Sequence, residues 1–145
     1  MPINVDKKHW LAAKIDIVKR HIDLYDSSRA STQDWYQFNN VECLSVLFSY
    51  LLEVGGLYKE RPNLTNNGTL VLDAFTISRV DAADCPQQTI TGDCGVFMLK
   101  FIEYLSSDRT LNFTQADIPL IRLNTLLMYS MINLAYNCYS INIMF

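Results

Sequence analysis

The feature that most constrains the fold is a pair of adjacent segments in which apolar and polar residues alternate. Residues 9–19 place one set of side chains on a single face: His9, Leu11, Ala13, Ile15 and Ile17. Residues 21–26 do the same with Ile22, Leu24 and Asp26. A period of two is typical of strands, and the polar pair Lys19-Arg20 between them predicts a hairpin. The hairpin sets Asp26 across from residues 9–11, with His9 and Asp26 both on the apolar face.

Helical spacing of apolar residues predicts the other elements. We expect helices near 34–54, 94–105 and 114–135. The first ends at the stop signal Gly55-Gly56, and the last is expected to bury Ile118, Ile121, Leu123 and Leu126. Strands are expected near 2–5, 9–19, 21–26 and 74–80. They form a small mixed or antiparallel sheet packed against the helices, so the predicted fold class is α+β.

Composition indicates one globular domain. Of 145 residues, 50% are apolar and 19% are charged, and the net charge is −3. Because no long basic run is present, nucleic-acid binding has no electrostatic support. The N-terminal residues lack the apolar core of a signal peptide, so we expect an intracellular location and cysteines that are thiols. The spacing of the cysteines and of the 2 histidines gives no zinc pattern, so we expect no metal and no cofactor.

The C-terminal stretch differs from the rest of the chain. After Arg122 no charged residue occurs, and residues 126–145 are apolar and about long enough to span a bilayer. Several Asn and Ser side chains in this stretch are costly in lipid. We therefore expect a buried helix with a poorly packed end, and no membrane partner, with this tail as a weak exception.

The segment Gln88-Thr-Ile-Thr-Gly-Asp-Cys94-Gly95 suits a thiol nucleophile. Cys94 starts an apolar helical run, where the helix N-terminus favours the thiolate, and the following glycine allows close backbone approach. An ordinary thiol is mostly protonated at neutral pH, so it needs a base. Gln88 is a candidate oxyanion donor, although the chemistry leaves Gln87 open. Asp93 could cap the helix. Taken alone, Cys94 would more often be a small buried residue.

His9 is the candidate base. It lies on the apolar parity, where an imidazole needs a hydrogen-bond partner, and Asp26 would fix its tautomer. Alternatively, His9 is a packing residue without a catalytic role, and Asp26 is a turn residue. His21 falls on the polar parity near the turn and is expected to be exposed.

The ordered set His9…Asp26…Gln88…Cys94 resembles the ubiquitin-like-protease family of cysteine peptidases, the SUMO (sentrin-specific) proteases, in their plant form. Its motifs are Pro2-Ile3-Asn4-Val5, His9-Trp10, Tyr25-Asp26-Ser27, Gln87-Gln88, Asp93-Cys94-Gly95-Val96-Phe97 and Phe113-Thr114-Gln115-Ala116-Asp117-Ile118-Pro119. The resemblance implies a papain-like cysteine-protease fold that cleaves after the Gly-Gly tail of a SUMO-like modifier, its partner. It also implies that Trp10 lines the tunnel for that tail. The family offset selects Gln88 over Gln87.

The resemblance covers roughly residues 2–125. We therefore expect 1–125 to be the C-terminal part of a catalytic domain, incomplete at its N-terminus, and 126–145 to be an atypical apolar tail. Two other functions are kept open: an inactive truncated fragment with at most weak modifier binding, and a protease for a different modifier. By resemblance, the location is the nucleus or the cytoplasm, and the oligomeric state is not predicted.

Overall fold

A computed structural model describes residues 1–28, 34–65 and 72–142, with side-chain detail over 1–28, 41–65 and 72–131. The helices are α1 (Asp34–Val54), the short α2 (Leu57–Glu60), α3 (Cys94–Ser106) and α4 (Ile118–Asn142). The described residues also include the 3-10 helices η2 (Pro62–Leu64), which follows α2, and η3 (Gln115–Asp117), which leads directly into α4. α1 ends at Val54, directly before the predicted stop signal Gly55-Gly56. Gly56 adopts a left-handed φ of 78°, a conformation that favours glycine.

Four strands form one mixed sheet, as predicted. They are β1 (Pro2–Val5), β2 (His9–Asp16), β3 (His21–Tyr25) and β4 (Thr76–Arg79), and they lie side by side in chain order. β1 and β3 pair antiparallel to β2, while β4 pairs parallel to β3. The hairpin between β2 and β3 turns at residues 17–20, with Asp16 opposite His21. The parallel pairing brings Arg79 level with Leu24, close to the end of β3.

The sheet is covered on both faces, so two separate cores exist. On one face, Leu11 and Ala13 of β2 pack with Val41 of α1. On the other face, Ala12 packs with α3 side chains such as Phe97 and Phe101. The alternation had indicated a single apolar face for residues 9–19. Ala12, which is fully buried, departs from that prediction because its small side chain lets α3 pack closely on the strand.

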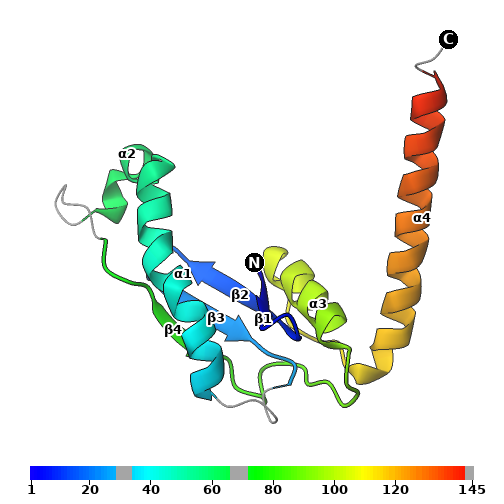
Figure 1. Ribbon diagram of the computed structural model, residues 1–145, viewed down its shortest axis with the longest axis horizontal. Coiled ribbons are helices and arrows are strands. Elements are labelled where there is room, and N and C mark those ends of the chain that lie inside the picture. Colours follow the sequence, from blue (N-terminus) through cyan, green and yellow to red (C-terminus); the bar gives the residue numbers. More distant parts are fainter. Residues whose placement is uncertain (29–33, 66–71, 143–145) are drawn as a thin grey trace.

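The last helix is long and leaves the body of the molecule (Figure 1). The predicted burial of Ile118 is confirmed, since it lies in the core under α3, whereas Ile121 is only half-buried and packs against that core. The predicted burial of Leu123 and Leu126 is wrong, because they are 53% and 65% exposed. The two helices diverge here, and Leu126 borders an open pocket between them, opposite Val96 and Leu99 of α3 (Figure 1). Within the described residues, no helix is both long and apolar enough to cross a membrane.

Candidate active site

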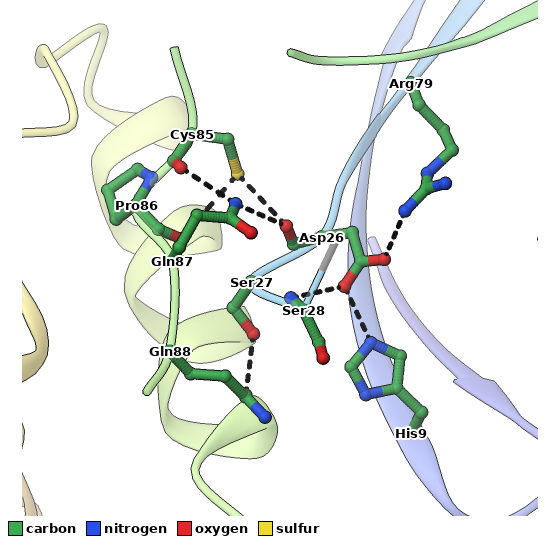
Figure 2. A network of polar contacts seen from close by, with 9 residues as sticks. All are labelled: His9, Asp26, Ser27, Ser28, Arg79, Cys85, Pro86, Gln87 and Gln88. Carbon is green, nitrogen blue, oxygen red and sulfur yellow. Dashed lines mark hydrogen bonds and ion pairs between the residues drawn. The ribbon is translucent and has the colours of Figure 1, made fainter. Parts of the chain in front are cut away.

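The hairpin joins His9 to Asp26, as its alternation predicted. His9 is the first residue of β2 and Asp26 follows the last residue of β3. Because Ala12 pairs with Tyr25, the side chains of His9 and Asp26 lie on one face, at the same end of the hairpin. The His9 Nε2 atom lies 2.7 Å from Asp26 Oδ1, and the Asp26 side chain is 1% exposed (Figure 2). Burial strengthens this contact, since little water competes for either group.

Asp26 has a second charged partner that sequence reasoning missed. The Arg79 guanidinium donates to Asp26 Oδ2 at 2.7 Å, and its side chain is also buried. The Ser28 backbone N–H donates to Asp26 Oδ1 at 2.8 Å. Figure 2 shows Arg79 and His9 approaching the carboxylate from different sides. A buried carboxylate with three donors is stabilised in its ionised form.

The two adjacent glutamines have different surroundings. The Gln87 side-chain nitrogen donates to the backbone oxygens of Asp26 and Cys85, each at 2.9 Å. The Gln88 side chain instead accepts the Ser27 hydroxyl at its Oε1, at 2.9 Å, and its backbone N–H donates to the Ser27 carbonyl at 2.7 Å. In Figure 2 the Gln88 amide nitrogen lies on the side away from Ser27. Ser27 therefore orients this amide, whereas the Gln87 amide nitrogen holds the loop.

Cys94 is the first residue of α3 and is buried. The helix start lies beside β2, because a Cβ built on Gly95 would sit 3.6 Å from Cδ1 of Trp10. Trp10 follows His9, is 37% exposed, and forms part of the surface over this region. Within the described residues, Cys94 makes no hydrogen bond to His9. Contacts between a nucleophile and its base are often loose in the absence of substrate.

Asp93 precedes the helix but does not cap it with its side chain, contrary to the expectation. Its carboxylate accepts from the Gln115 amide nitrogen at 2.7 Å and from the Arg122 guanidinium. The hydrogen bond from Gln115, and then that from Arg122, lower the pKa of Asp93 below its ordinary value. Asp93 also has helical backbone angles, φ −88° and ψ −6°, in place of the extended ones typical of a capping residue, which accords with the missing cap.

The second histidine lies in a different cluster. His21 was expected to be exposed, but it is half-buried between β3 and β4. Its ring nitrogens lie 2.6 Å from the Thr76 hydroxyl and 2.9 Å from the Ser78 hydroxyl. Within the described residues, no group of three or more His, Cys, Asp or Glu is placed to hold a metal ion.

Residues 1–136 match the family model described as the Ulp1 protease family, C-terminal catalytic domain. The chain belongs to the Ulp1 protease family. It is 29% identical over 116 residues to sentrin-specific protease 2 of Homo sapiens, an alignment covering 80% of this chain and 17% of that protein. It is 32% identical over 114 residues to a sentrin-specific protease of Caenorhabditis elegans, covering 79% of this chain and 14% of that protein.

A solved structure shares the fold. It is the X-ray structure of the C-terminal Ulp1 protease domain in complex with Smt3, the yeast orthologue of SUMO, with a TM-score of 0.57 and 27% identity. The match covers 84% of this chain and 47% of the solved chain. The protein thus spans under half of that domain and less than a fifth of the curated relatives.

Proposed function

We propose that this chain carries the catalytic centre of a cysteine peptidase that hydrolyses the bond after the C-terminal Gly-Gly of a SUMO-like modifier. The observation that carries the proposal is the buried contact of His9 with Asp26. His9 belongs to β2, and α3, which begins with Cys94, packs on that strand. A histidine oriented by a carboxylate, together with a cysteine at a helix N-terminus, is the group set of thiol proteases.

The Asp26 contact supports an assignment of the His9 ring nitrogen that acts as the base. An ionised carboxylate only accepts hydrogen bonds, so His9 Nε2 must carry the proton in the 2.7 Å contact. The lone pair of the neutral ring then lies on Nδ1. We assign Nδ1 as the atom that takes the thiol proton, and Asp26 as the group that stabilises the resulting imidazolium.

The reaction follows from these assignments. The Cys94 sulfur bonds to the carbonyl carbon while its proton moves to His9 Nδ1. When the tetrahedral intermediate collapses, the carbon–nitrogen bond breaks and the imidazolium gives its proton to the leaving amine. Water then attacks the thioester with His9 as base, which releases the modifier's carboxylate and restores the thiol. The leaving amine is a lysine side chain in a conjugate, or the next residue in a precursor.

Gln88 is the proposed side-chain donor for the negative oxygen of the tetrahedral intermediate. The hydroxyl of Ser27 donates to its Oε1, and among the described residues the amide nitrogen has no hydrogen-bond partner. Gln87 is a poorer candidate, because its nitrogen already donates to two backbone oxygens. The backbone N–H of Cys94 would be the second donor.

A SUMO-like modifier is the proposed substrate and partner. The solved Ulp1 domain is bound to Smt3, the yeast orthologue of SUMO, which supports this choice. Trp10 is partly exposed and lies beside Gly95 at the start of α3, and we assign it to the wall of the passage for the tail, which would exclude side chains. A Gly-Gly tail meets that steric condition. An intracellular location, in the nucleus or the cytoplasm, remains a prediction.

A precursor panel tests the proposal. The chain is incubated with SUMO-type and ubiquitin-type precursors, and the products are measured by intact mass. We expect cleavage of the SUMO-type precursor after Gly-Gly, loss of cleavage in Cys94→Ala, and retained cleavage in the control Cys43→Ala, because Cys43 is exposed on α1. Cleavage of the ubiquitin-type precursor alone would assign a different modifier. Absence of all cleavage would favour the inactive fragment.

A further inference from the structure

The start of α3 has an unusual N-terminus. The first N–H groups of a helix have no partner inside it, and an aspartate at the N-cap normally accepts one of them. Asp93 occupies this position without a side-chain bond to the helix. Its backbone carbonyl accepts the N–H groups of Val96 and Phe97 at 2.9 and 3.1 Å. Within the described residues, the N–H groups of Cys94 and Gly95 have no acceptor.

Two residues from the next segment hold the Asp93 carboxylate instead. The amide nitrogen of Gln115 donates to Oδ2 at 2.7 Å, and the Arg122 guanidinium pairs with Oδ1. Arg122 also donates to the Gly92 carbonyl at 3.4 Å. Both oxygens of the carboxylate thus have donors on the side of η3 and α4. The lowered pKa of Asp93 favours its anionic form. Without Gln115 and Arg122, this anion would be attracted to the positive N-terminus of the helix.

Gln115 is itself fixed at both ends. Its Oε1 accepts the backbone N–H of Thr89, the residue after Gln88, at 2.8 Å. The turn that carries it is closed by a capping box, in which Thr114 N–H donates to the Asp117 carboxylate at 2.8 Å. One amide therefore ties the loop of the oxyanion candidate to the residue preceding the nucleophile.

We propose that Gln115 and Arg122 are positioning residues that hold the Asp93 carboxylate off the start of α3, so that the N–H groups of Cys94 and Gly95 stay available to the thiolate and to the intermediate's oxygen. The inference rests on the proposed function. A carboxylate capping the helix would occupy these donors and cancel the positive end of the helix dipole, where negative charge develops in the reaction. The N–H groups of Cys94 and Gly95 would then bind the Asp93 carboxylate in place of the thiolate or the intermediate's oxygen.

The test measures the alkylation rate of Cys94 by iodoacetamide at about pH 7, a reaction of the thiolate, by peptide mass spectrometry. Cys43 in the same sample reports ordinary reactivity, since it is exposed. We expect Gln115→Met to slow Cys94 alkylation and to lower kcat by roughly 2- to 30-fold, the range for a charge at a helix N-terminus, with KM little changed. Arg122→Gln, a half-exposed site, should act in the same direction and covers the case in which Gln115→Met does not fold.

A rescue separates this role from simple tethering. Adding Asp93→Ala to Gln115→Met removes the carboxylate that would cap the helix, so alkylation and kcat should recover at least severalfold. If Gln115 merely tethers the loop, the double variant should be as slow as Gln115→Met or slower, and the inference fails. Glu103→Gln is the matched control, because this carboxylate also accepts from two side chains, Lys100 and Arg109, but lies toward the other end of α3.

The outcomes separate the inference from the proposed function. If Cys94 of the unmodified chain reacts no faster than Cys43, the proposed function is contradicted and this inference falls with it. If Cys94 reacts faster than Cys43 but neither Gln115→Met nor Arg122→Gln slows it, the proposed function stands and this inference alone is overturned.

Discussion

At the scale of single residues, the site depends on the short segment that follows β3. Asp26 receives the His9 ring and the Arg79 guanidinium on its two oxygens. Its neighbour Ser27 holds Gln88 through both a side-chain and a backbone hydrogen bond. Two consecutive residues therefore orient the proposed base and the proposed oxyanion donor.

The sequence predicts part of this arrangement. The contact of His9 with Asp26 follows from alternation in two adjacent segments, which is a local signal. The contact of Arg79 with Asp26 joins residues 53 positions apart and needs β4 to lie parallel to β3. Periodicity indicates a strand there but neither its neighbour nor its direction, so this contact could not be predicted.

Gln88→Ala tests the oxyanion assignment. We expect kcat/KM to fall by an amount equivalent to about 2.7–4 kcal/mol, the range for loss of one such donor. The measurement is precursor cleavage, with His21→Ala as the control that leaves the rate unchanged. A Gln88→Ala variant with near-normal activity would shift the role to Gln87 or to backbone groups.

Arg79→Met tests the buried ion pair. The change leaves the Asp26 charge buried without its cationic partner, so the free energy of unfolding should fall by about 3–5 kcal/mol. Urea unfolding followed by circular dichroism measures it. Arg109→Met is the matched control, because its pair with Glu103 is half-exposed and should be worth about 1 kcal/mol or less. Equal effects of the two changes would contradict the prediction, because the buried pair would then stabilise the fold no more than the half-exposed one.

At the scale of elements, helical spacing identified which residues share a face of α4 but not whether another layer covers that face. Ile118 is buried in the core that α3 covers, and Ile121 is half-buried against it. Leu123 and Leu126 continue the same pattern on a part of the helix that has left the body. Burial depends on how closely a neighbouring element packs, and here an open pocket separates Leu126 from α3. The pattern of one helix does not contain that information.

Ile118→Ala and Leu126→Ala test this difference within one helix. Ile118 is 1% exposed, so its truncation should lower the free energy of unfolding by about 2–5 kcal/mol. Leu126 is 65% exposed, so its truncation should change stability by about 0.5 kcal/mol or less. Thermal or urea unfolding measures both. A large loss for Leu126→Ala would mean that this part of α4 is packed in solution.

At the scale of the whole molecule, the two halves of the site come from different layers. His9 and Asp26 belong to the β2–β3 hairpin, while Cys94 begins the helix that covers one face of the sheet. The fully buried Ala12 sets how closely these layers approach, and Trp10 contacts the helix start beside it. Catalysis requires that this packing hold a thiol and an imidazole within a fraction of an ångström of a productive geometry.

Covalent capture tests the central claim most directly, namely that Cys94 is a nucleophile activated by His9. The chain is mixed with a SUMO-type modifier whose C-terminal glycine carries an electrophile, and the adduct is located by peptide mass spectrometry. We predict one adduct on Cys94, no adduct in Cys94→Ala, and formation slowed by at least about 100-fold in His9→Ala, since a general base contributes about 10²–10⁴-fold. An adduct on Cys43 or Cys85, or an equal rate in His9→Ala, would contradict the account.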